Sequence, residues 1–242
     1  GQNAAGYYHG IRINGIANFN SGNGNIVMRG KSYNVSVASG EAGWGVGFYA
    51  LTASGTIDSG TGTIYLDGYA QASGTGYGAG MYFYTNNPLT IKSANTTTDA
   101  IKIVGKGVGT AGQSWGFETE DSTLSILATG TGGGITINTT QQRTGDNYDI
   151  VLRGVTNILA KSGPINLIGR QADGIADGRM FISNNVYLGS KAGSDVLTSS
   201  SDITIKYDDY FFSGYTPYIA TTGKVVGLPL IYQLSSHNLL IL

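Results

Sequence analysis

The sequence predicts an all-β solenoid, and three observations lead to that class. A pair of apolar residues separated by one other residue recurs six times along the chain, at intervals of 30 to 38 residues. Such a period indicates stacked repeats. Glycine is abundant, with 39 of 242 residues, while only 12% of residues are charged. No segment shows the apolar spacing of three and four that a helix requires. The six pairs are Ile26/Met28, Ile64/Leu66, Ile101/Ile103, Ile135/Ile137, Ile165/Leu167 and Ile203/Ile205.

Each apolar pair predicts a strand with one face toward the interior. Residues separated by one position point to the same side of a strand, so Ile135 and Ile137 face inward and Thr136 faces outward. Two further short strands complete each unit. The second strand is expected at residues 10–13, 45–48, 80–83, 115–117, 149–152 and 180–182. The third strand carries Ile16 and Phe19, Leu51 and Ile57, Leu89 and Ile91, Leu124 and Ile126, Val155 and Ile158, and Val186 and Leu188.

Three strands in constant order predict about six coils with three faces, in which each strand pairs in parallel with its equivalents. Turns rich in Gly, Ser and Asn, such as residues 21–24, 59–62 and 130–134, lead into the next apolar pair, because these residues tolerate positive φ. The segment after each pair varies in length, which predicts loops at one corner of the solenoid. These variable segments are residues 31–42, 69–79, 106–114, 139–147 and 170–177.

The repeat domain is expected to span residues 1–210, and residues 211–242 are expected to form an atypical C-terminal cap or tail. Residues 206–212 are unusually aromatic, and residues 225–242 are largely apolar and lack the glycine turns. The end of a solenoid exposes unpaired strand edges, which a terminal segment of this kind would cover. The same segment is also compatible with a point inside a longer array.

Composition argues against several classes of function. The formal net charge is −1, and the charges are scattered, so the sequence shows no basic stripe for nucleic acid. No apolar run reaches the ~18 residues of a membrane span. Cysteine is absent, which excludes disulfides, thiolate zinc sites and cysteine nucleophiles. This absence is compatible with export across a bacterial envelope.

A family resemblance rests on the pattern Gly-x-Ile-x-Ile, a variable loop, Gly-Val-x-Phe/Ile, a short strand and Ser-Gly-x-Gly. Residues 62–66 (Gly-Thr-Ile-Tyr-Leu), 134–137 (Gly-Ile-Thr-Ile) and 45–48 (Gly-Val-Gly-Phe) carry it. Residues 6–210 resemble the repeat regions of filamentous-haemagglutinin-type adhesins, which are two-partner secretion exoproteins and related autotransporter passengers. The resemblance implies a right-handed parallel β-helix, extracellular or on the bacterial cell surface, that serves attachment, biofilm formation or toxin display. The secretion-domain motif Asn-Pro-Asn-Gly/Leu is missing, so we expect an internal stretch of a longer protein.

The densest acidic cluster consists of Glu118, Glu120 and Asp121 and is one candidate ligand surface. On a strand, Glu118 and Glu120 point the same way, which suits cation binding or acid/base work on a glycosidic bond. We favour the alternative interpretation, in which these residues form a solvated strand edge.

A second candidate ligand surface consists of Tyr207, Asp208, Asp209 and Tyr210. Carboxylates beside aromatic rings can bind sugars, but adjacent strand residues face opposite sides, so a capping or surface role is favoured. The chain has 16 tyrosines. Those such as Tyr82 are either stacking platforms for a ligand or, in the favoured interpretation, ordinary strand residues.

Three glycosylation sequons begin at Asn34, Asn95 and Asn138. Such sequons arise readily by chance in a chain rich in Asn and Thr. The histidines, His9 and His237, lie at opposite ends of the chain, so a shared triad or metal centre is not expected. We expect no catalytic residue, metal site or cofactor.

The sequence as a whole predicts a non-enzymatic extracellular adhesin segment, either a β-helical stalk or a binding surface. Its expected partner is a glycan or a protein on a host or microbial surface. One alternative is a polysaccharide-active lyase or glycoside hydrolase, because a fold does not determine function. Another alternative is a subunit that assembles with copies of itself into an extracellular filament.

Overall fold

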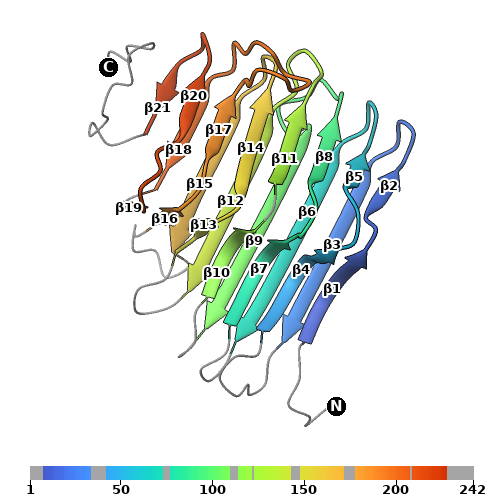
Figure 1. Ribbon diagram of the computed structural model, residues 1–242, viewed down its shortest axis with the longest axis vertical. Helices are drawn as coiled ribbons and strands as arrows, with labels where there is room; N and C mark the ends of the chain where they lie inside the picture. Colours follow the sequence, from blue (N-terminus) through green and yellow to red (C-terminus); the bar gives the residue numbers. More distant parts are fainter. Residues whose placement is uncertain are drawn as a thin grey trace.

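The computed structural model describes residues 8–33, 42–72, 77–109, 114–121, 123–142, 148–171, 178–207 and 209–227. These residues form three parallel sheets of seven strands each and contain no helix. Successive strands enter sheets A, B and C in turn, so each sheet takes every third strand of the chain (Figure 1). Within the described residues there is accordingly no helix of the length and apolarity needed to cross a bilayer.

The strands of the three sheets have the following bounds. Sheet A consists of β1 (Tyr8–Gly15), β4 (Ala42–Leu51), β7 (Tyr77–Tyr84), β10 (Ser114–Glu120), β13 (Ile150–Leu152), β16 (Arg179–Ile182) and β19 (Asp209–Phe212). Sheet B consists of β2 (Asn18–Asn20), β5 (Gly55–Asp58), β8 (Leu89–Ser93), β11 (Thr123–Ala128), β14 (Val155–Ala160), β17 (Val186–Gly189) and β20 (Tyr218–Ala220). Sheet C consists of β3 (Ile26–Tyr33), β6 (Ile64–Ala72), β9 (Ile101–Gly109), β12 (Ile135–Gln142), β15 (Ile165–Gln171), β18 (Ile203–Lys206) and β21 (Val225–Val226).

The strand pairing confirms the predicted all-β parallel solenoid. Every pair of neighbouring strands is parallel. The predicted apolar pairs lie in register in sheet C, where Ile137 pairs with Ile103 on one side and Leu167 on the other. The period of the sequence is therefore the length of chain between two equivalent strands of one sheet.

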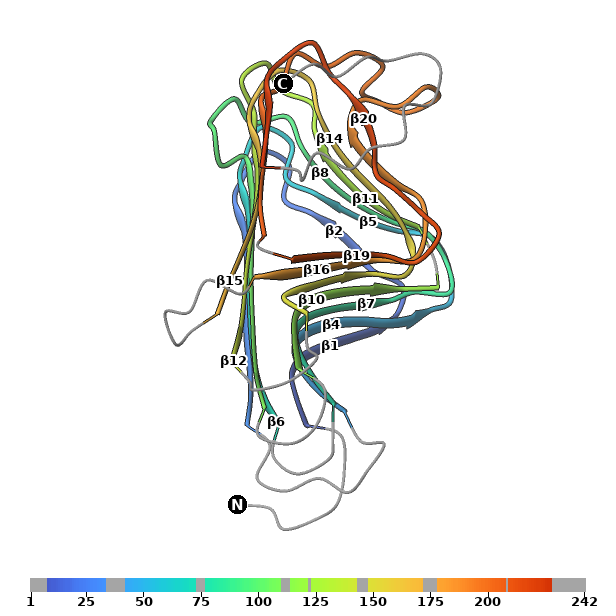
Figure 2. The same ribbon diagram turned by 90° about the vertical axis from the view of Figure 1, so that its left-hand side faces the viewer.

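The core fills the space between the three sheets, which form the walls of a triangle when the solenoid is seen end-on (Figure 2). Phe48, Phe83 and Phe117 of sheet A stack across neighbouring strands, with ring centroids 5.3 and 5.2 Å apart. All three rings are fully buried. Burying one such side chain contributes roughly 1.5–3 kcal/mol relative to its exposed state.

The first strand of sheet B differs from the sequence prediction. Ile16 is 60% exposed and Phe19 is 37% exposed, although the sequence places both in the interior. Ala17 takes the core position beside Ile16 and is fully buried. Because β2 is the edge strand of its sheet and pairs only with β5, no described strand covers the outer side of Phe19.

The strands of sheet C run further than the sequence predicts. Loops are expected from Lys31, Tyr69, Lys106 and Thr139 onward, but strand pairing continues through these positions. The inward positions of these extensions hold small residues such as Gly68. The apolar alternation that predicts a strand is therefore missing from this part of the sequence. The remaining residues of the predicted loops, 34–41, 73–76, 110–113, 143–147 and 172–177, lie outside the described residues.

A column of glycines lets sheets A and C touch along these extensions. A Cβ atom added to Gly68 of sheet C would lie 1.9 Å from the carbonyl oxygen of Gly80 in sheet A. The same contact recurs between Gly30 and Gly45, at 1.9 Å, and between Gly105 and Gly116, at 2.0 Å. No side chain fits at such distances, so the backbones of the two sheets are in direct contact. The column consists of Gly10, Gly30, Gly45, Gly68, Gly80, Gly105 and Gly116.

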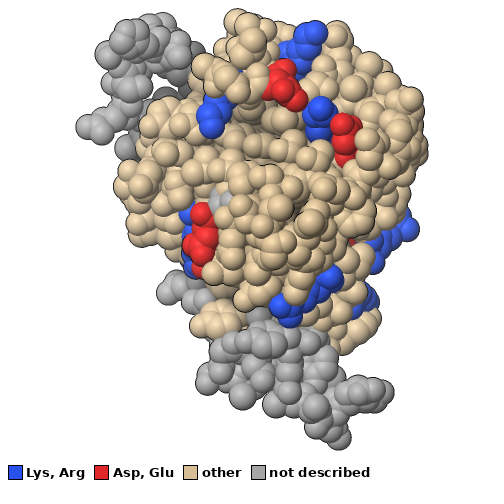
Figure 3. Space-filling view, turned by 45° about the vertical axis from the view of Figure 1, so that its right-hand side comes forward, with Lys and Arg blue, Asp and Glu red and all other residues tan. Residues whose placement is uncertain are grey.

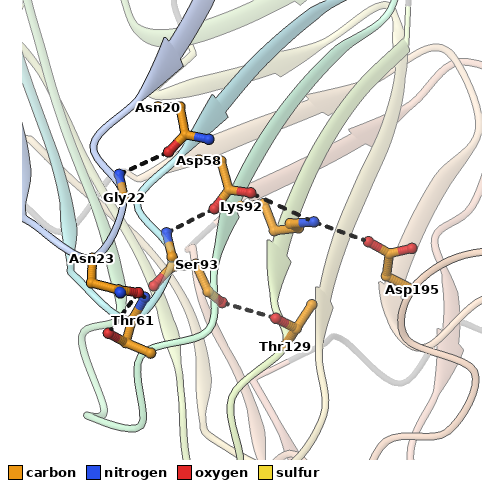
Figure 4. A network of polar contacts seen from close by, with 10 residues as sticks. Asn20, Gly22, Asn23, Asp58, Thr61, Lys92, Ser93, Thr129 and Asp195 are labelled. Carbon is orange, nitrogen blue, oxygen red and sulfur yellow. Dashed lines mark hydrogen bonds and ion pairs between the residues drawn. The ribbon is translucent and has the colours of Figure 1, made fainter.

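The corner between sheets B and C is held by a ladder of polar contacts (Figure 4). Asn20 Oδ1 accepts a hydrogen bond from the Gly22 amide, and Asp58 Oδ1 accepts one from the Gly60 amide, each at 2.8 Å. Gly22 and Gly60 have φ of +71° and +57°, which confirms the predicted turns. Lys92 Nζ lies 3.6 Å from an Asp58 carboxylate oxygen and joins this strand to its neighbour.

The regular pairing extends past residue 210, where the sequence predicts the end of the repeat. β19, β20 and β21 each add a strand to one sheet, and Val225 pairs with Ile203. Residues 228–242, the apolar part of the predicted cap, lie outside the described residues. The expected boundary therefore falls inside the strand-paired region.

Replacement of Gly68 by alanine tests the glycine column. We expect the free energy of unfolding to fall by more than about 2 kcal/mol, because the added Cβ meets backbone that cannot move aside. In the matched variant Gly24→Ala the nearest atom, the Ser21 carbonyl oxygen, lies 3.5 Å away, and we expect a loss below about 1 kcal/mol. Denaturant unfolding measures both values, and equal losses would contradict the contact.

Candidate functional site

The outer face of sheet A gathers aromatic and charged side chains from neighbouring strands. We call this group the sheet A stripe. Figure 2 shows that the strands of sheet A turn away from sheet C along their length. The members of the stripe are His9 and Arg12 of β1, Trp44 and Tyr49 of β4, Tyr82 and Tyr84 of β7, Trp115, Glu118 and Glu120 of β10, Arg153 after β13, and Phe181 of β16.

The stripe exists because side chains change sides at the glycine column. Strand alternation would place Trp44 and Val46 on the same face. Val46 belongs to the main core, however, whereas Trp44 belongs to a separate outer cluster. Gly45 lies between them and contacts sheet C through its backbone. The same change of side separates Trp115 from Phe117 on β10.

Trp44 lies flat against its own strand because Gly47 has no side chain. A Cβ atom at Gly47 would lie 2.7 Å from Trp44 Cε3. The rings of His9 and Tyr82 stack on the indole, with centroids 4.1 and 4.5 Å from it, and Trp44 is only 5% exposed. Burial, with a smaller contribution from Arg12, lowers the pKa of His9 to about 4. In this part of the stripe the rings therefore pack against one another and do not form an open platform for a ligand.

Glu118 and Arg153 form a hydrogen-bonded pair in the middle of the stripe, in which the carboxyl group is buried and the Arg153 side chain is 36% exposed. Arg153 Nη1 donates to Glu118 Oε1 at 2.6 Å, and Glu118 is 1% exposed. The guanidinium lies 5.3 Å from the Trp115 ring centroid and 5.9 Å from that of Phe181. Glu118 Oε2 is buried and has no hydrogen-bond partner among the described residues. Burial raises the pKa of Glu118 to about 8, opposed by Arg153 and assisted by Glu120. A solvated strand edge is therefore the wrong interpretation for this residue.

Two tyrosines meet the other two carboxylates of the predicted acidic cluster. The Tyr82 hydroxyl donates to Glu120 Oε2 at 2.7 Å. Tyr84 forms a hydrogen bond with Asp121, and this bond raises the pKa of Tyr84. Asp121 is exposed at the end of β10 and has a φ of +64°. The structure thus brings the acidic cluster together with tyrosines that the sequence analysis treated as ordinary strand residues.

The accessible part of the stripe is a polar edge, which we call the rim. Tyr49 pairs in register with Tyr84, and Tyr84 with Glu120. The Arg12 guanidinium lies 4.6 Å from the Tyr49 ring centroid, and Asp121 completes the rim. Figure 3 shows that charged side chains are sparse on this side of the molecule. The rim therefore offers a cation, two phenol groups and two carboxylates on a rigid sheet.

The second predicted ligand surface has a different environment. The Tyr207 side chain lies in the core and is 6% exposed, so it offers no surface to a ligand. The Tyr210 hydroxyl donates to the Gly227 carbonyl at 2.7 Å. Asp208 and the side chain of Asp209 lie outside the described residues. The Tyr210 hydroxyl thus joins the end of the described chain to β19.

The remaining candidates are dispersed. Asn95 donates to the Thr61 carbonyl at 2.6 Å and accepts hydrogen bonds from the amide and hydroxyl of Thr97. Asn138 lies on β12 and is partly exposed, whereas Asn34 and His237 lie outside the described residues. Among the described residues no group of three or more His, Cys, Asp or Glu side chains could hold a metal ion.

The sequence analysis missed Arg153 and the tryptophans, although the repeat contains a signal for them. Arg153 follows Glu118 by 35 residues, and Glu120 follows Tyr82 by 38. Glu118 is in register with Tyr82 and with Val151, so each of these separations is one turn of the repeat plus two residues, and outward residues about one period apart are neighbours. The change of side at the glycines hides Trp44 and Trp115, because strict alternation assigns them to the core.

Comparison with known proteins gives no assignment. No protein-family model matches the chain, and neither a curated protein nor a solved structure matches it. The function is therefore argued from the geometry of the described residues.

The raised pKa of Glu118 predicts a pH dependence of stability. Its folded pKa of about 8 lies above the ordinary value of 4.5, so the folded protein binds more protons between these limits. Stability from this group is complete below about pH 4.5 and is lost as pH rises through about 8. Glu118→Gln keeps an acceptor for Arg153 and removes the titration.

We expect the wild type to lose about 2 kcal/mol or more of unfolding free energy relative to Glu118→Gln between acidic and mildly alkaline pH. His9, with its lowered pKa, acts in the opposite direction at acidic pH, but both proteins contain it and its effect cancels in the difference. Urea unfolding across the pH range measures both profiles. Parallel profiles would contradict the raised pKa.

Proposed function

We propose that this chain is a non-enzymatic binding segment of an extracellular bacterial adhesin, which serves attachment or biofilm formation. We further propose a right-handed β-helix of about six coils, since crossovers between parallel strands are right-handed in about 98% of cases. The solenoid acts as a stalk that carries a binding surface on its side. Its partner is a glycan or a protein on a host or microbial surface.

The observation that carries this proposal is the rim on the outer face of sheet A. Tyr49, Tyr84 and Glu120 lie in one row across three strands, with Arg12 and Asp121 beside them. Aromatic rings with polar ends suit ligands that have both apolar faces and hydroxyl groups, as sugars do. The buried stripe beneath holds these side chains in place, which limits the entropy lost on binding.

Burial of Glu118 supports binding rather than catalysis at this site. A glycoside hydrolase needs two carboxyl groups on either side of the scissile bond. Glu118 is 1% exposed, and one of its oxygens is bonded to Arg153, so a substrate bound at the rim reaches only Glu120 and Asp121. A polysaccharide-active enzyme on the same fold is the second candidate, since Glu120 and Asp121 are two carboxyl groups at the accessible edge of the stripe.

The filament alternative proposes that the first described coil pairs with another copy of the chain. β1, β2 and β3 are edge strands in the described residues. Ile26 and Met28 are only partly buried, whereas the equivalent Ile64 and Leu66 of the next coil are fully buried. Strand edges of this kind pair readily with a further strand, which in this alternative belongs to a second copy of the chain.

A surface-binding screen with a rim variant tests the proposal. The double variant Tyr84→Phe/Glu120→Gln removes one hydroxyl and one charge from the rim, and Tyr218→Phe/Asp195→Asn removes the same groups from exposed positions elsewhere. We expect the wild-type chain to bind surface glycans or cells. This binding should fall at least about tenfold in the rim variant and stay unchanged in the control variant. Equal binding by both variants would refute the rim, and the release of sugar fragments would favour the enzyme.

A further inference from the structure

The outer face of sheet C carries a second group of functional side chains. This face points away from sheets A and B (Figure 2), so it is separate from the rim. Basic residues and tyrosines occupy its outward positions on three neighbouring strands. We call this group the sheet C patch, and it consists of Arg29, Lys31 and Tyr33 of β3, Tyr65 and Tyr69 of β6, and Lys102 and Lys106 of β9.

Two of the four cations in the sheet C patch have no carboxylate partner among the described residues. Arg29 and Lys102 each lie near an aspartate, at 3.9 and 3.4 Å. Lys31 and Lys106 form no ion pair with any residue that the structure describes. On a chain with so few charged residues, this unpaired positive charge needs an explanation.

The two unpaired lysines converge on one tyrosine. Lys31, Tyr69 and Lys106 lie in register on consecutive strands. Lys31 Nζ lies 4.7 Å from the Tyr69 ring centroid and Lys106 Nζ lies 5.7 Å from it. The Tyr33 ring lies 4.5 Å from Lys31 Nζ and is 56% exposed. A hydrogen bond between Tyr33 and Lys31 raises the pKa of Lys31. The lysine is therefore charged at neutral pH.

The spacing of the cations defines the ligand further. Neighbouring strands lie about 4.8 Å apart, so the backbones of Lys31 and Lys106 are about 9.6 Å apart along the solenoid. The two unpaired lysines are thus separated by one strand of sheet C, β6. Two sugars of an extended polysaccharide cover a comparable distance.

We propose that the sheet C patch binds an acidic polysaccharide whose chain runs along the solenoid axis and carries a carboxylate on every second sugar. Its carboxylates accept hydrogen bonds from Lys31 and Lys106, and a sugar ring packs on the exposed ring of Tyr33. This site is independent of the rim.

The charge density of the patch favours a polysaccharide over nucleic acid. Duplex DNA carries one negative charge per ~1.7 Å of axis, far denser than two unpaired cations about 9.6 Å apart. The net charge of −1 on the whole chain also opposes a dense polyanion.

Binding of the full chain to hyaluronan, which has a carboxylate on every second sugar, tests this inference. Lys31→Gln/Lys106→Gln removes both unpaired cations, and the control Lys161→Gln/Lys224→Gln removes two exposed lysines outside the sheet C patch. We expect the first variant to bind hyaluronan at least about tenfold more weakly and the control to be nearly unchanged. Binding should also weaken with added salt, and circular dichroism should show both variants folded.

Three results would overturn the proposal. The first is no hyaluronan binding above that of the neutral glycan dextran. The second is an equal loss of affinity in both double variants. The third is tighter binding of single-stranded oligothymidylate than of hyaluronan, which would assign the patch to nucleic acid. The rim variant Tyr84→Phe/Glu120→Gln should bind hyaluronan normally, so failure of one site does not decide the other.

Discussion

The direct backbone contact between sheets A and C is the constraint on which the rest of the structure depends. A side chain at Gly68 or Gly80 would separate the two sheets. The contact lets sheet C continue as strand beyond the core, and it makes sheet A turn away at the same place. The turn moves Trp44 to the outside while Val46 stays in the core. Both proposed binding surfaces therefore depend on residues that have no side chain.

The pair of Glu118 and Arg153 is better understood as part of this architecture than as a reactive group. Burying a charged carboxylate is costly, and pairs with a buried partner often add little net stability. The pair fixes the Arg153 guanidinium beside Trp115 and Phe181, so it joins the strands on either side of the stripe. The unpartnered Glu118 oxygen makes this arrangement sensitive to protonation.

The fold could be predicted from the sequence to a large extent, and the sites only in part. Pairs such as Ile135/Ile137 identify sheet C because a large buried side chain must return in every coil. The acidic cluster at Glu118 is visible in sequence, but its partner Arg153 is one period away and its burial depends on the bend at the glycines. The sheet C patch is invisible for the same reason, since Lys31, Tyr69 and Lys106 meet only through strand register.

Amide hydrogen exchange of β9 tests the central contact most directly, because the sequence pattern predicts a loop where the structure has a strand. If sheet C continues along sheet A, the amides of Gly105 and Gly107 are hydrogen-bonded between neighbouring strands and covered by sheet A. They should then exchange nearly as slowly as those of Ile101 and Ile103 in the core part of the same strand. Exchange at the rate of an open loop from Gly105 onward would contradict the account.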